Sequence, residues 1–78
     1  MDFQIYNSIK NTEVVINKII IDKSVERYKL EHPIVIHPLT YFLEDAGLKY
    51  ISSNRNGYWR FLVIDDKKYM LARIKYGI

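Results

Sequence analysis

The sequence of 78 residues contains no cysteine. A chain without thiols cannot form a disulfide, a thiolate zinc site or a cysteine nucleophile. No apolar run exceeds four residues, which excludes a membrane span because a spanning helix needs about 20. The first residues show no basic segment followed by an apolar one, so the sequence predicts no secretory signal and a cytoplasmic location.

Glycine and proline are also scarce, with three glycines and two prolines in the whole chain. Scattered glycines cannot build a phosphate-binding loop. We expect them to mark turns within a single domain over residues 1–78. A chain this short buries only about 60–65% of its unfolded surface, so a deep substrate cavity is hard to provide. We therefore expect no enzyme and no cofactor.

What is present is typical of a globular protein, with 49% hydrophobic and 27% charged residues and a net charge of +3. Isoleucine, lysine, asparagine and tyrosine together supply 32 of the 78 residues. These residue types have AT-rich codons, which suggests an AT-rich genome such as that of a phage or a mobile element.

The pattern predicts an α+β fold, a small antiparallel sheet of four or five strands with one helix packed on one face. Asn56-Gly57 is a strong hairpin signal. It predicts a two-residue turn that places Ser53 opposite Arg60. A second turn near residues 66–67 then adds a third strand, completes a C-terminal meander and places Arg73 opposite Arg60.

The predicted helix spans about residues 38–47, since Pro38 suits a first helical turn and Gly47 a stop. Residues 28–36 alternate between apolar and polar types, which indicates a half-buried strand. Residues 12–21 fit either a strand or a helical stripe, and their β propensity favours a strand. Residues 3–6 could add a short strand.

The candidate site is the basic and aromatic face that this meander would present. Arginine offers a planar fork for carboxylate or phosphate, and tyrosine offers rigid contact area. The alternative is a solvated face whose long side chains cover neighbouring leucines. The predicted partner-binding residues are Arg55, Tyr58, Arg60, Tyr69, Arg73 and Lys75.

Other chemistry finds less support in the sequence. His32 and His37 lack a third ligand at a recognised spacing, so we expect no metal site. The acidic pairs at residues 44–45 and 65–66 fit a helix end and a turn better than a catalytic cleft.

One local stretch resembles the recognition helix and wing of winged-helix repressors. The run over residues 42–48, followed by Arg55-Asn56-Gly57-Tyr58-Trp59-Arg60, carries the resemblance. It implies a helix in the DNA major groove with Thr40 and Tyr41 on its reading face. It also implies backbone contacts from Arg55, Asn56 and Arg60.

These observations favour a small non-enzymatic binding protein that docks on an anionic macromolecule, with an acidic protein surface preferred over nucleic acid. Its most concrete form is a phage- or mobile-element-encoded inhibitor of a host enzyme or defence complex. One alternative is a DNA-binding regulator that uses residues 38–47 and 55–60. Another is a self-assembling subunit, such as a homodimer, that pairs through an edge strand containing residues 19–21. No membrane partner is expected.

Overall fold

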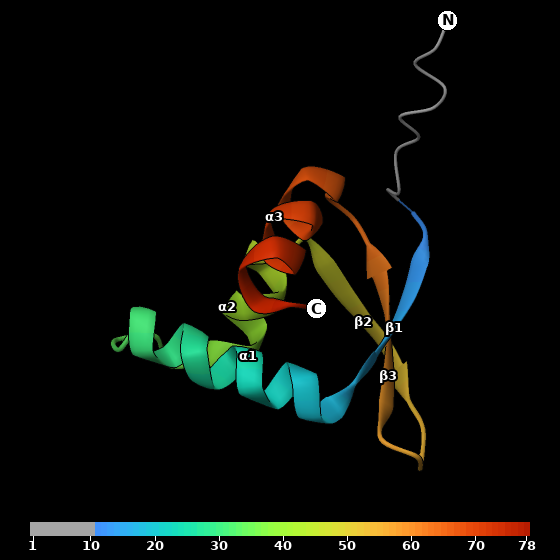
Figure 1. The fold of residues 1–78 in the computed structure, drawn as a ribbon, viewed down its shortest axis with the longest axis horizontal. Helices are drawn as coiled ribbons and strands as arrows, with labels where there is room; N and C mark the ends of the chain where they lie inside the picture. Colours follow the sequence, from blue (N-terminus) through green and yellow to red (C-terminus); the bar gives the residue numbers. More distant parts are fainter. Residues whose placement is uncertain (1–10) are drawn as a thin grey trace, which may run out of the picture.

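The computed structural model describes residues 11–78, in which three helices lie beside a three-stranded antiparallel sheet (Figure 1). The elements are β1 (Glu13–Asn17), α1 (Lys18–Glu31), α2 (Pro38–Asp45), β2 (Leu48–Ser53), β3 (Tyr58–Val63) and α3 (Asp66–Tyr76). The fold is α+β, but the predicted four or five strands with one helix were wrong. The strand predicted at residues 3–6 lies outside the described residues.

The central strand of the sheet is β3, with β1 on one side and β2 on the other. β1 pairs with it antiparallel, from Glu13 opposite Leu62 to Asn17 opposite Tyr58. This pairing joins segments that are far apart in the chain, so no local turn signal could have predicted it.

The turn between β2 and β3 is longer than the predicted two-residue loop. The Asn54 side-chain oxygen accepts backbone N–H groups of the turn at 2.9 and 3.1 Å. Gly57 takes the left-handed conformation at φ +84°, as in three-residue hairpin loops. The register therefore differs from the prediction, and a β-bulge in β2 brings Ser52, not Ser53, opposite Arg60.

The strand predicted over residues 28–36 was wrong, because residues 28–31 end helix α1 and residues 32–36 belong to no helix or strand. Of the segment 12–21, only residues 13–17 are a strand. Asn17 begins the helix, because its side-chain oxygen accepts the Ile19 N–H at 2.8 Å. Ile21, Ser24 and Tyr28 are buried, at a spacing that matches one helical face. Residues 19–21 are thus helical, and the edge strand expected to contain them does not form.

Helix α3 replaces the third strand of the predicted meander. Asp65 caps its first turn by accepting the Lys68 N–H at 3.1 Å, and Gly77 ends it in the left-handed conformation. Tyr69 and Ala72 are the buried residues of this helix. The predicted pairing of Arg60 with Arg73 was therefore wrong.

The predicted helix near residues 38–47 is confirmed as α2, with Pro38 in its first turn. Gly47 follows it at φ +68°, and its carbonyl accepts the N–H groups of Ile64 and Asp65. Phe42 is the buried residue of the helix. The end of α2 is in this way tied to the start of α3.

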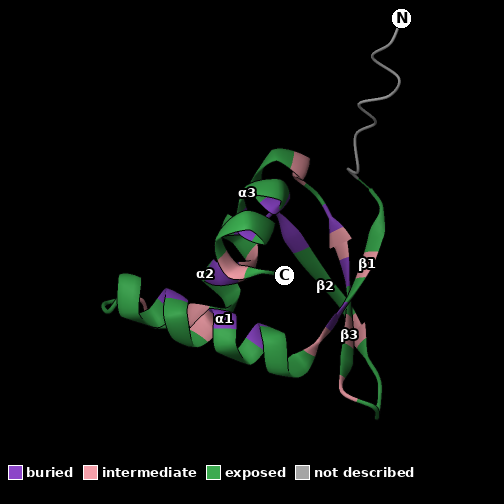
Figure 2. Ribbon diagram, viewed as in Figure 1, coloured by how far each residue is buried: buried purple, intermediate pink, exposed green. Residues whose placement is uncertain are grey.

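The helices gather on one side of the sheet, and the core lies between the two layers (Figure 2). Strand alternation points Phe61 and Val63 of β3 toward the helices, where both are fully buried. The core comprises Ile16, Ile21, Tyr28, Phe42, Ala46, Leu48, Phe61, Val63, Tyr69 and Ala72. Within residues 11–78, no helix has the length and apolar character needed to cross a membrane.

Candidate partner-binding face

The sheet presents its second side away from the helices, and we call this side the open sheet face. Alternation places on it the residues whose neighbours in sequence point into the core. Arg60 sits at its centre, opposite Val15 on one strand and Ser52 on the other. The face comprises Glu13, Val15, Asn17, Lys49, Ser52, Tyr58, Arg60 and Leu62.

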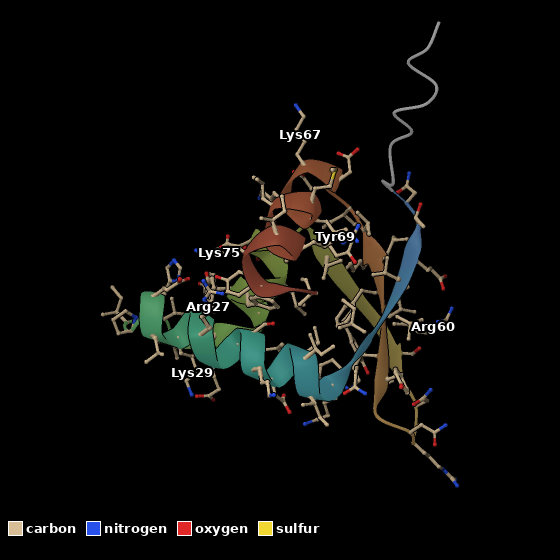
Figure 3. All side chains as sticks on the ribbon, viewed as in Figure 1. Arg27, Lys29, Arg60, Lys67, Tyr69 and Lys75 are labelled. Carbon is tan, nitrogen blue, oxygen red and sulfur yellow. The ribbon has the colours of Figure 1, made fainter. Side chains whose placement is uncertain are left out.

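Three of the six predicted site residues belong to the β2–β3 hairpin. Tyr58 and Arg60 lie on the open sheet face, and Arg55 lies in the turn at its end. Arg60 projects from the side of the sheet opposite the helices (Figure 3). Arg55 is exposed and forms no ion pair with another described residue, so its charge is available.

Arg60 forms an ion pair with Glu13 across the strands, and both side chains are about half exposed. Cross-strand opposite charges stabilise a sheet modestly. The Glu13 carboxylate also fixes the direction of the guanidinium, which has five N–H donors and keeps some of them for another acceptor. Lys49, opposite Leu62, adds a second cation to the same face.

The other three predicted residues lie on α3, in the helical layer. Tyr69 is buried with 5% of its surface exposed, so its ring belongs to the core. Burial also raises its pKa. Arg73 lies over this ring, with its guanidinium carbon 5.9 Å from the centroid. The face predicted from sequence is thus divided between the two layers of the molecule.

Lys75 is committed to a partner within the chain. Its Nζ lies 3.0 Å from Glu31 Oε1, and Tyr76 donates its hydroxyl to the same oxygen at 2.9 Å. These hydrogen bonds hold the pKa of Glu31 below its usual value and raise the pKa of Lys75. Figure 3 places Lys75 beside Arg27, between α3 and α1.

Sequence reasoning missed Glu13, Val15 and Lys49 as members of the open sheet face. Residues 14–16 are all apolar, so the sequence shows no alternation that would separate the two faces of β1. The partner strand was not identifiable from the sequence, because β1 joins β3 rather than a neighbour in sequence.

The described residues contain no group of three histidine, aspartate or glutamate side chains placed to hold a metal ion. Buried side-chain oxygen and nitrogen atoms in this part of the chain all have hydrogen-bond partners. No family model, curated protein or solved structure is detectably similar to the chain.

Proposed function

We propose that this chain is a small non-enzymatic binding protein that docks its open sheet face on the acidic surface of a partner protein. The observation that carries the proposal is the set of Arg55, Tyr58, Arg60 and Lys49 on one uncovered hairpin, with a single carboxylate, Glu13, among them. Charge complementarity of this kind steers association and selects the partner.

The face is built to bind at low entropic cost. Its backbone is fixed by pairing on both sides of β3, and the Arg60 guanidinium is already oriented by Glu13. A partner carboxylate meets a group that loses little freedom on binding. Tyr58, with 42% of its surface exposed, supplies the kind of rigid aromatic contact that dominates many interfaces.

The mixture of apolar and charged groups favours a protein over nucleic acid. Val15 and Leu62 are apolar members of the face and flank the Glu13–Arg60 pair in the register. A protein interface combines such apolar contacts with a polar rim.

Affinity capture from the native host, with a matched pair of variants, tests the proposal. The double variant R55A/Y58A removes one arginine and one tyrosine from the face. The control Y41A/R73A removes the same residue types elsewhere, and Tyr41 is as exposed as Tyr58, at 46% against 42%. We expect R55A/Y58A to weaken the captured complex at least about tenfold and the control to leave it within about twofold. Equal losses in both variants would contradict the proposal.

The partner's identity can be narrowed in the same preparation. If the chain inhibits a host enzyme or defence complex, adding the wild-type chain lowers the turnover of the captured enzyme. Adding R55A/Y58A in its place leaves the turnover close to that of the enzyme alone. The proposal of phage or mobile-element origin rests on residue usage alone.

A second candidate function is DNA binding, favoured by one structural observation. α1, α2 and the β2–β3 hairpin follow each other in the order that the winged-helix resemblance requires from its second helix onward. The charge of α2 argues against it, because this helix carries Glu44 and Asp45 and no lysine or arginine. Titration of labelled duplex DNA distinguishes the two. DNA binding loses about 10³–10⁵ in affinity between 50 and 200 mM salt for 6–10 phosphate contacts, whereas the protein complex changes far less.

A further inference from the structure

The helical layer contains a pocket on the side of the molecule opposite the open sheet face. It lies between the end of α1, the end of α2 and the side of α3, with a volume of about 240 Å³. Its apolar lining includes Phe42, Ala46 and Ala72, all of them core residues. Leu71, with 66% of its surface exposed, lies at its margin.

One wall of the pocket is aromatic and held in place by hydrogen bonds. The rings of Tyr28 and His32 stack with centroids 4.1 Å apart. The Tyr28 hydroxyl donates to Asp45 Oδ2 at 2.6 Å. Burial and this hydrogen bond raise the pKa of Tyr28 to about 12, so the phenol stays neutral and Asp45 stays engaged. The wall is therefore preformed, and the half-buried His32 ring, rather than the buried Tyr28 ring behind it, forms its more exposed part.

One lysine at the pocket has no ion-pair partner among the described residues. Lys68 and Lys75 both line it, whereas Asp45 is the single lining carboxylate. Lys75 is paired with Glu31, and the Asp45 carboxylate directs Oδ2 at the Tyr28 hydroxyl and forms no ion pair with either lysine. Lys68 forms no ion pair with another residue of the described chain, so it is the cation left for a ligand carboxylate.

We propose that this pocket binds an aromatic side chain of a partner polypeptide in which an aspartate or glutamate adjoins the aromatic residue. The ring stacks between Leu71 and the Tyr28–His32 wall, and the carboxylate pairs with Lys68. The volume is below the roughly 300–1,000 Å³ of pockets that take drug-sized ligands and suits a single side chain. Such anchors in small pockets are the usual centres of protein interfaces.

The proposal is independent of the open sheet face, and the two can fail separately. The probe is the capped peptide Gly-Glu-Phe-Asp-Gly, titrated into the isotope-labelled full chain and followed by amide NMR shifts. We expect saturable shifts at Ala46, Lys68 and Leu71 and none on β3. The peptide Gly-Glu-Ala-Asp-Gly should give none of them. Equal shifts with both peptides, or shifts spread over β3, would overturn the proposal.

Two charge reversals on the same helix provide the matched control. Lys68 lines the pocket, and its neighbour Lys67 does not. Both are exposed, and Figure 3 shows Lys67 pointing away from the other helices. Lys68→Glu should weaken peptide binding about fivefold, and Lys67→Glu less than about twofold. Both variants keep Asp65, which caps the first turn of α3 in each of them. A similar loss of peptide affinity in both variants would therefore refute the role of Lys68.

A free small molecule could also supply an aromatic ring and a carboxylate to the pocket, and phenylacetate tests this alternative. It carries an aromatic ring and one carboxylate without a peptide backbone. We expect phenylacetate to bind more weakly than the aromatic peptide. Tighter binding of phenylacetate would overturn the assignment to a partner polypeptide.

Discussion

Replacing Gly47 with alanine should destabilise the fold far more than the same change at Gly57. Both glycines have positive φ, +68° and +84°. An alanine in this region costs about 1–2 kcal/mol at either site. At Gly57 a new Cβ meets nothing within 4 Å, whereas at Gly47 it would lie 2.4 Å from the Asp65 carbonyl oxygen.

The contact at Gly47 cannot relax cheaply. Its carbonyl accepts the N–H groups of Ile64 and Asp65 at 2.8 and 3.3 Å, so moving residue 65 away strains both hydrogen bonds. Each is worth about 1 kcal/mol. We therefore expect Gly47→Ala to lower the free energy of unfolding by about 2–4 kcal/mol and Gly57→Ala by about 1–2. A domain of this size has roughly 4–12 kcal/mol in total.

Urea unfolding followed by the fluorescence of Trp59, the single tryptophan, measures both variants. With a slope of about 1 kcal/mol/M, the midpoint of Gly47→Ala should fall about 1–2 M below that of Gly57→Ala. Circular dichroism provides the control that both variants start from the same helix content. Equal midpoints would refute the reasoning, because they would mean that the α2–β2 junction yields without cost.

Three further predictions follow from the core, a cap and a buried phenol. Phe61→Ala should cost about 3–5 kcal/mol by calorimetry, and Leu30→Ala, 83% exposed, less than about 0.5. Asp65→Ala should lower the free energy of unfolding by about 1 kcal/mol, since the Lys68 N–H loses the side chain that caps it. Asp65→Asn keeps a capping oxygen without the charge, so recovery of stability in this variant would assign the effect to the cap. Because the pKa of Tyr28 is raised to about 12, the folded state holds this proton while an unfolded tyrosine loses it near pH 10. The wild type should therefore lose stability as pH rises from 10 to 12, and Tyr28→Phe should lose less over the same range in pH-dependent melting. An unchanged slope in that variant would assign the alkaline loss to other groups.

The sequence was sufficient for those elements whose signals are local. Pro38 and Gly47 bracket α2, and the aromatic strand Tyr58–Val63 with its turn glycine defines the hairpin. The inward direction of Phe61 follows from alternation once the strand is known. Each of these inferences needed only neighbouring residues.

Two of the errors arose where apolar residues occupy consecutive positions, and the third, at residues 28–36, arose from an alternation that does not form a strand. Residues 69–72 and 19–21 satisfy both a strand and a helix period, and β propensity then favoured the wrong one. Asp65 and Asn17 carried the deciding information as helix caps, but an aspartate before a turn gives the same local signal.

Three of the six predicted site residues lie together on the hairpin, and the other three were misplaced with the strand that proved to be a helix. Arg55, Tyr58 and Arg60 belong to the hairpin that was predicted, although with another turn and register, and they remain together at one end and one side of the sheet. Arg73 and Lys75 were grouped with them only through the strand that proved to be α3. Glu13 could not be found, because pairing between distant strands depends on the whole fold.

The pairing of β1 with β3 has a kinetic consequence. The hairpin and the helices close short loops, whereas Glu13 and Leu62 must meet across most of the chain, which is slow because of loop-closure entropy. We expect β1 to dock late in folding. The Glu13–Arg60 pair then forms only in the finished molecule, so newly made or partly opened copies would not yet present the complete open sheet face.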